Sequence, residues 1–131
     1  MDAVSRHSRP HSAAIAGALL LAAALVLAPR SGWGHAFPDH SDPRVGHTVE
    51  APPPAVRIWF DGAIEPVFST IRVEDEDKRR VDKGNPRVDP RDSTVLEVSL
   101  PPLSPGKYRV IWSVVARDGH RTEGNFTFRV R

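Results

Sequence analysis

The sequence predicts an all-β fold, either a sandwich or a small barrel of short strands. From Val56 onward, apolar and polar residues alternate with a period of two, which is typical of half-buried strands. No stretch after residue 34 keeps the 3.6-residue period of a helix. Prolines fall between the alternating runs, where a missing backbone donor does not interrupt a strand ladder. Several short strands separated by turn residues favour a sandwich or barrel.

Five segments carry the alternation, and in each of them every second residue is apolar. In chain order they are 56–60, 70–73, 96–100, 108–114 and 125–130. Side chains two residues apart share one face of a strand, so the apolar face of each segment is expected to point into one core. The predicted core comprises Val56, Ile58, Phe60, Ile71, Val73, Leu96, Val98, Leu100, Tyr108, Val110, Trp112, Val114, Phe126, Phe128 and Val130.

The segment 74–92 is charged and rich in turn residues. Four acidic residues, 74–77, are followed at once by three basic ones, 78–80. These blocks can neutralise one another across a solvated hairpin or loop, which is the structure we predict here. A Ca²⁺ site at Asp75 and Asp77 is the alternative, but the run lacks the glycine and the distant bidentate glutamate of a known calcium loop.

Residues 1–34 have the pattern of a cleavable secretory signal peptide. A polar start with two arginines precedes an apolar run, 13–28. This run of 16 residues is shorter than the roughly 20 that a permanent transmembrane helix needs. An uncleaved N-terminal anchor is the alternative. We expect export to the periplasm, with no direct membrane insertion of the mature chain.

The expected cleavage site lies directly before His35. Gly32 and Gly34 are small residues at the −3 and −1 positions of that cut. Cuts after Ala28 or after Gly32 are the competing choices. Removing 34 of the 131 residues leaves 97, enough for one small domain with one core, residues 35–131.

The composition of the mature domain excludes several classes of partner and site. The leader holds three of the 18 basic residues and one of the 16 acidic residues, which leaves 15 of each and a formal net charge of zero. We therefore expect neither a nucleic-acid nor an anionic-membrane partner. The chain has no cysteine, and its single methionine is Met1, so a metal would have to be held by nitrogen and oxygen donors.

An aspartate and a histidine follow the strand predicted at 108–114. Its inward face runs on with the same period of two to Asp118 and His120, which places a carboxylate and an imidazole at one rim of the fold. Gly119 between them allows the backbone to bend. Taken alone, the triplet is more typical of a turn in which the aspartate accepts a backbone hydrogen bond than of a metal site.

His35 would add two nitrogen donors once the leader is removed. A free α-amine has a pKa of roughly 8, so a divalent metal can displace its proton near neutral pH, and the amine and ring of one histidine can chelate the same ion. With His120 and Asp118 the set becomes three nitrogens and one oxygen, which suits tetragonal Cu(II). Zinc accepts the same donors but prefers a tetrahedron. His40 and His47 are either auxiliary ligands or exposed loop residues.

Two groups of residues carry a family resemblance that extends over nearly all of residues 35–131. The first is His35-Ala36, followed by Ser41, Pro43, Gly46, Pro54, Val56, Ile58 and Phe60; the second is the run LSPGKYRVIW at 103–112, Asp118-Gly119-His120, and GNFTF at 124–128. Together they resemble the CopC copper-resistance proteins.

The resemblance implies a periplasmic copper-binding protein with an immunoglobulin-like or cupredoxin-like Greek-key β-sandwich. It also implies that Cu(II) is held by the amine and ring of the N-terminal histidine and by the Asp and His of a D-x-H motif, here His35, Asp118 and His120. Some members carry a methionine-rich loop for Cu(I), which this chain lacks, so a Cu(II)-only site is favoured. A second departure is Phe60-Asp61-Gly62, where members often have Phe-Ser-Glu, so any contribution of that glutamate is lost.

Three functions fit these observations. The first is a carrier or buffer that binds copper in the periplasm and acts in copper homeostasis or resistance; any transport step then needs a partner such as an inner-membrane copper transporter. The second is a copper-dependent oxidative enzyme with an N-terminal histidine brace, although Asp118 would fill a position that oxygen chemistry needs open. The third is a metal-free β-sandwich interaction module. We favour the carrier or buffer and predict no enzymatic activity.

Overall fold

The computed structural model describes residues 35–131, which fall within one compact unit. The predicted signal peptide, residues 1–34, lies outside the described residues, so its cleavage stays a prediction. Within the described part of the chain, no helix is long and apolar enough to cross a membrane.

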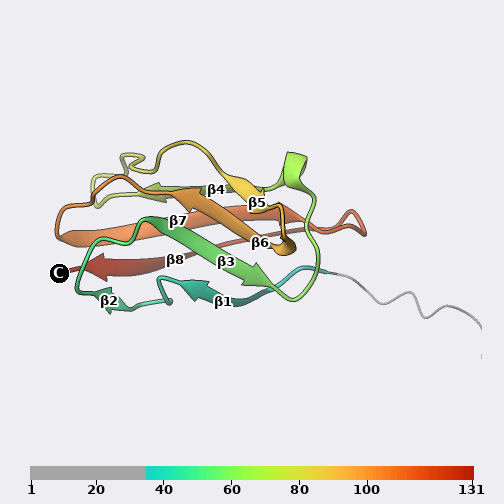
Figure 1. Cartoon of the computed structure of the whole chain (residues 1–131), viewed down its shortest axis with the longest axis horizontal. Helices are drawn as coiled ribbons and strands as arrows, with labels where there is room; N and C mark the ends of the chain where they lie inside the picture. The colour runs from blue at the N-terminus through green and yellow to red at the C-terminus, as the bar shows by residue number, and fades with distance from the viewer. Residues whose placement is uncertain (1–34) are drawn as a thin grey trace, which may run out of the picture. The chain divides into compact units, whose positions relative to one another are not determined.

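Two four-stranded sheets make up the fold (Figure 1), as the all-β prediction requires. One sheet has the order β1-β3-β6-β5 and the other β2-β8-β7-β4. The first comprises β1 (Pro38–Asp42), β3 (Ala55–Phe60), β6 (Asp92–Ser99) and β5 (Arg87–Asp89); the second comprises β2 (Thr48–Val49), β8 (Arg121–Val130), β7 (Gly106–Val115) and β4 (Thr70–Glu74). A short 3₁₀ turn, η1 (Pro66–Phe68), precedes β4. The Greek-key β-sandwich is confirmed.

The core contains all fifteen residues that the alternation places inward. Each is at most 9% exposed, because both sheets turn their apolar face toward the other. The predicted core omits five further buried residues: Ala36, Ile64 and Leu103 lie in connections, Ala116 follows β7 on its inward face, and Val95 lies within β6 at a position that the alternation places outward. Burial of the Ala36 side chain in the core anchors the segment just before β1.

The charged segment 74–92 is more ordered than a solvated loop. Arg79 pairs with Asp75 and with Asp77, so the predicted neutralisation of opposite charges does occur. However, residues 87–89 form β5, and the Asp82 side chain is 0% exposed and accepts a hydrogen bond of 2.8 Å from the Val73 amide. The prediction of a solvated hairpin or loop agrees with the exposed residues and with the β5–β6 hairpin, but it does not foresee the buried side chain of Asp82 and its hydrogen bond to the backbone.

Glu97 is a second carboxylate whose burial the sequence conceals. Its outward position in β6 predicts an exposed side chain, yet the residue is 4% exposed. Arg57, its cross-strand partner in β3, donates to Oε2 at 2.7 Å, and Arg87 of β5 donates to Oε1. Both oxygens are therefore occupied by guanidinium groups, so this carboxylate helps to hold three strands together.

The long hairpin of β7 and β8 positions the candidate site. The two ten-residue strands pair along their whole length, from Gly106 opposite Val130 to Val115 opposite Arg121. Their connecting turn projects at one end of the sandwich, and the first described residues of the chain reach that same end (Figure 1). Two segments that are far apart in sequence thus meet at one rim.

Candidate metal site

A tight turn, and not continued strand alternation, places Asp118 and His120 at the rim. β7 ends at Val115, and the Gly119 amide donates to the Ala116 carbonyl at 2.9 Å. The Ala116 amide in turn donates to the His120 carbonyl at 2.9 Å, which closes the turn. Gly119 has a φ of +88°, in the region that glycine adopts without strain. Strand alternation thus predicts the correct rim for Asp118 and His120, although a turn and not a continued strand places them there.

The two oxygens of Asp118 have different roles. Oδ1 accepts a hydrogen bond of 3.0 Å from the His120 amide, which is the backbone bond expected of an aspartate in such a turn. Oδ2 lies 3.0 Å from Nδ1 of the His120 ring and 3.9 Å from Nδ1 of His35. A structural role in the turn and a role as metal ligand are therefore compatible for this aspartate, because each uses a different oxygen.

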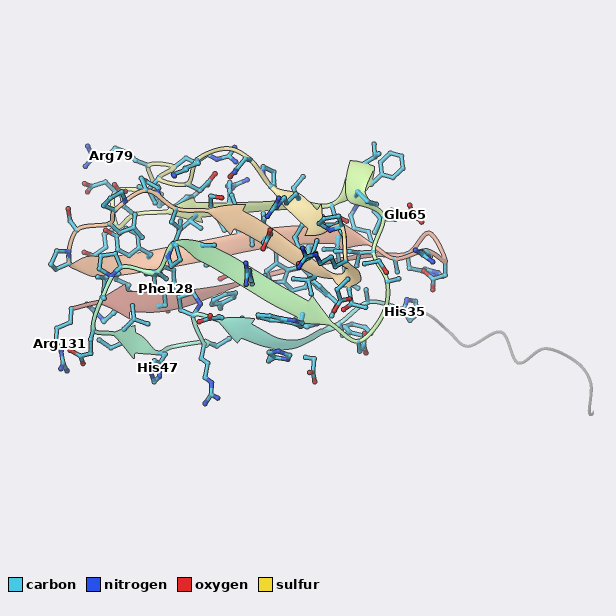
Figure 2. All side chains as sticks on the ribbon, in the orientation of Figure 1. His35, His47, Glu65, Arg79, Phe128 and Arg131 are labelled. Atoms are coloured by element: carbon cyan, nitrogen blue, oxygen red, sulfur yellow. The ribbon has the colours of Figure 1, made fainter. Side chains whose placement is uncertain are left out.

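His35 reaches this turn from the opposite end of the described chain. The rings of His35 and His120 lie with centroids 4.5 Å apart at an interplanar angle of 68°. One ligand atom from each of His35, Asp118 and His120 lies within 4.8 Å of the others. Figure 2 shows the labelled His35 side chain at the end of the sandwich where the hairpin turn projects. The structure thus brings together the three residues that the sequence singles out.

The backbone just after His35 is held by three hydrogen bonds. The Thr122 hydroxyl donates to the Ala36 carbonyl at 2.6 Å. The Phe37 amide donates to Oδ1 of Asp61 at 2.7 Å, and the Asp61 amide donates to the Phe37 carbonyl at 2.9 Å. Sequence reasoning missed both partners, because they lie 86 and 24 residues from the backbone groups that they bind.

Gly62 completes the surroundings of His35. A Cβ at this position would lie 3.4 Å from the His35 carbonyl oxygen, so the loop after β3 passes close to the N-terminal segment. Asp61 and Gly62 are the two residues at which this chain departs from the Phe-Ser-Glu pattern. The position that lacks the glutamate thus packs against the His35 backbone.

Solvent access differs among the three side chains. The His35 side chain is 30% exposed, that of Asp118 26% and that of His120 64%.

The hydrogen bond from the His120 amide lowers the pKa of Asp118 below its ordinary value, against the opposing effect of desolvation. The His120 ring and, more weakly, the His35 ring act in the same direction. The carboxylate is therefore ionised over the whole neutral range and is ready to accept a cation.

The donor set fits a divalent metal. Metal–nitrogen and metal–oxygen bonds of about 2 Å place neighbouring donors roughly 3 Å apart and opposite donors roughly 4 Å apart. The separations of 3.0 Å and 3.9 Å from Oδ2 of Asp118 to the two rings are in this range, and the overall limit of 4.8 Å requires only small side-chain shifts. Two imidazoles and a carboxylate suit Cu(II) or Zn²⁺.

His40 and His47 lie outside this group. His40 stacks on Trp59 with ring centroids 4.5 Å apart, and its Nδ1 lies 2.8 Å from Oδ2 of Asp39. His47 is exposed in the connection before β2. Within residues 35–131, the group of His35, Asp118 and His120 is the single set of three side chains close enough to share an ion, so the acidic pair Asp75 and Asp77 forms no such set.

Sequence comparisons identify relatives of the whole domain. Residues 39–131 match the model of the CopC domain, a match that includes Asp118 and His120 and begins just after His35. Protein YobA of Escherichia coli K12 is 33% identical over 102 residues, which cover 77% of this chain and 82% of that protein. Copper transport protein CutJ of Bacillus subtilis is 27% identical over 113 residues, covering 86% of this chain but 21% of CutJ.

Solved structures share the fold at similar identity. CopC from Methylosinus trichosporium OB3b has a TM-score of 0.65 and 31% identity, covering 73% of this chain and 93% of that one. PcoC, a methionine-rich copper resistance protein from Escherichia coli, has a TM-score of 0.64 and 27% identity, covering 75% and 100%. The similarity places the chain among copper-binding and copper-transport proteins and not among enzymes. The chain belongs to the CopC family.

Proposed function

We propose that this protein is a periplasmic carrier or buffer of Cu(II), which it holds through His35, Asp118 and His120. The observation that carries the proposal is the convergence of side chains that are far apart in the sequence, with ligand atoms within 4.8 Å of one another. Core packing does not require such a cluster, since all three side chains are at least a quarter exposed. A bound divalent cation would be a common partner for the carboxylate and the two imidazoles.

The proposed site is completed by removal of the signal peptide. Cleavage before His35 converts its backbone nitrogen into an amine, which joins the ring of the same residue as a chelating pair. The site then offers three nitrogens and one oxygen. Before cleavage that nitrogen belongs to an amide and is a poor ligand, so export and metal binding are coupled.

Cu(II) is favoured over Cu(I) by the donor types. Thioether and thiolate ligands select Cu(I), whereas imidazole, amine and carboxylate donors suit Cu(II). PcoC is methionine-rich; in contrast, this chain has Met1 alone and no cysteine. Zn²⁺ accepts the same donors but ranks below Cu(II) in the divalent affinity order.

An open site supports a role in transfer. The His120 side chain is 64% exposed, so a partner can approach the metal from the solvent side. CutJ is a copper transport protein, and the segment of it that matches this chain makes up only 21% of its length. By analogy with CutJ, in which a similar segment belongs to a copper transport protein, we propose that this domain exchanges copper with an inner-membrane copper transporter.

Intact mass spectrometry of the exported protein, with and without one equivalent of Cu(II), tests the proposal. We expect the mass of residues 35–131 and the gain of one copper per chain. A different N-terminus, or no copper retained by the chain that starts at His35, would contradict it. Thermal unfolding gives a second readout, because a metal that binds the folded state must raise the Tm, whereas a metal-free interaction module would show no change.

A further inference from the structure

The segment between His35 and β1 is fixed more firmly than its position at the start of the domain suggests. Terminal residues of a domain are usually poorly ordered unless something ties them down. Here the Ala36 side chain is 0% exposed within the core, and its carbonyl accepts the Thr122 hydroxyl bond. Phe37 exchanges two hydrogen bonds with Asp61, one through its amide and one through its carbonyl.

Neither Asp61 nor Thr122 belongs to the group of possible ligands. Each binds the backbone one or two residues after His35, from two different parts of the fold. Thr122 lies in β8, two residues after His120, and Asp61 directly follows β3. Thr122 therefore links the N-terminal segment to the hairpin that carries Asp118 and His120, and Asp61 links the same segment to the loop after β3.

We propose that Asp61 and Thr122 are positioning residues that hold His35 at the metal site before the metal arrives. This inference rests on the proposed Cu(II) function and deepens it. His35 is the first residue beyond the clamp formed by Asp61 and Thr122. Its ring and its backbone nitrogen are thereby kept beside Asp118 and His120 in the metal-free protein.

The expected effect arises from chain entropy. Fixing the backbone of one residue opposes binding by an amount equivalent to about a tenfold change in affinity. With the clamp intact, that ordering is already achieved when the domain folds. Without it, copper would have to order His35 and Ala36 during binding, so the affinity falls although every ligand remains.

Single variants in the full mature protein test the clamp. Thr122→Val removes the hydroxyl donor and Asp61→Ala removes the carboxylate acceptor. Thr122→Ser and Asp61→Asn keep a donor and an acceptor, respectively, and serve as conservative rescues. Thr127→Val is the matched control, because Thr127 is a half-buried threonine of the same strand whose side chain makes no hydrogen bond among the described residues.

Three readouts are needed: Cu(II) affinity by competition titration, the electron paramagnetic resonance spectrum of the bound ion, and hydrogen exchange of the Phe37 amide without metal. We expect Thr122→Val and Asp61→Ala to bind about tenfold more weakly, with an unchanged spectrum and faster Phe37 exchange. The rescues and Thr127→Val should resemble the wild type in all three.

The outcomes separate this inference from the proposed function. If the wild type binds Cu(II) and both disruptive variants bind it equally well, the positioning role is refuted while the metal site stands. A changed spectrum in Asp61→Ala would also refute it, since Asp61 would then act as a ligand. If the wild type binds no Cu(II), the proposed function itself fails, whatever the Phe37 exchange shows about the clamp.

Discussion

Two turns of this molecule use an aspartate in the same way toward the backbone and differently toward side chains. Oδ1 of Asp118 accepts the amide of His120 at 3.0 Å, and Oδ1 of Asp75 accepts the amides of Asp77 and Arg79 at 2.9 Å each. Oδ2 of Asp118 faces two imidazoles, whereas Oδ2 of Asp75 lies 3.3 Å from the guanidinium of Arg79. The backbone motif is shared, and the partner of the second oxygen distinguishes the two turns.

This difference separates a candidate metal site from a structural hairpin. A guanidinium carries a permanent charge and already neutralises the carboxylate, so no cation is needed at Asp75. Imidazoles can instead share a metal with a carboxylate, because a neutral ring nitrogen is itself a ligand. Density of acidic residues is therefore a poor guide to metal binding in this chain: the run 74–77 is more acidic than the turn at Asp118, yet it lacks the histidines.

Loss of a proposed ligand at the Asp118 turn should have the largest effect on Cu(II) affinity. We expect His120→Ala to weaken Cu(II) binding more than about a hundredfold, since loss of even outer-shell partners of metal ligands costs roughly 10–100-fold. Isothermal titration with a competing chelator measures it. The control is His40→Ala, because His40 stacks on Trp59 away from the site. This variant should bind copper as tightly as the wild type does. Equal losses in both variants would contradict the assignment.

Asp82 should dominate the stability of the charged hairpin without affecting copper. Asp82→Ala removes the acceptor of the Val73 and Gly84 amides and the partner of Arg80, and a buried donor left without a partner costs about 2 kcal/mol of unfolding free energy. Urea denaturation of the metal-free protein measures this loss. A matching fall in Cu(II) affinity would show that the two regions are coupled, and would remove the contrast between them.

The same aspartate predicts a pH dependence. Burial alone would raise the pKa of Asp82, but the bonds from Arg80, Val73 and Gly84 outweigh it and lower the pKa below the ordinary value. A carboxylate whose pKa is depressed by folding adds stability above the unfolded pKa of about 3.9, and that stability is lost as the pH falls through the folded value. Asp82→Ala should therefore lose less stability than the wild type between pH 5 and pH 2, measured by urea midpoints; identical acid limbs would contradict this.

A matched pair of substitutions compares the two turns directly. Asp118→Asn keeps an oxygen for the His120 amide but removes the negative charge, so we expect Cu(II) binding to fall about tenfold, as for a lost charge-assisted contact. Asp75→Asn should leave the affinity unchanged. Both are measured by competition titration at one pH, and equal effects of the two substitutions would remove the distinction between the turns.

The smallest effect is expected at Arg79. Its side chain is 72% exposed, and its pairs with Asp75 and Asp77 are screened by water. We expect Arg79→Ala to shift the Tm by at most a few degrees, since exposed ion pairs add little stability. Calorimetry of the metal-free protein measures it, and a much larger shift would mean that the hairpin depends on this pair.

The part of the fold that the sequence predicts is the part held by side-chain burial. Each long strand is marked by alternation, as in Tyr108, Val110 and Trp112 of β7, because every inward residue must be apolar. β1 and β5 give no such signal. β1 reads PDHSD with one buried residue, Ser41, and β5 has three residues with none fully buried. Backbone pairing with neighbouring strands orders them, and this pairing needs no particular pattern of side chains.

The candidate site divides in the same way. His35, Asp118 and His120 are predictable because metal-binding chemistry needs their residue types, and cleavage and turn signals lie beside them. Asp61 and Thr122 are not, because they act on backbone groups 24 and 86 residues away, and no local pattern marks such a bond. Strand alternation predicts the rim position of Asp118, but the turn at Gly119, with its φ of +88°, is what produces it.

The central claim is that the backbone nitrogen of His35 binds copper once it is a free amine. The most direct test compares Cu(II) affinity of a chain that starts at His35 with that of a chain carrying one alanine before it. The extension keeps every proposed ligand side chain, converts the His35 nitrogen from an amine into an amide, and moves the free amine one residue away from the ring. We expect binding to weaken more than about a hundredfold, as for loss of a direct ligand. Equal affinities of the two chains would contradict the account.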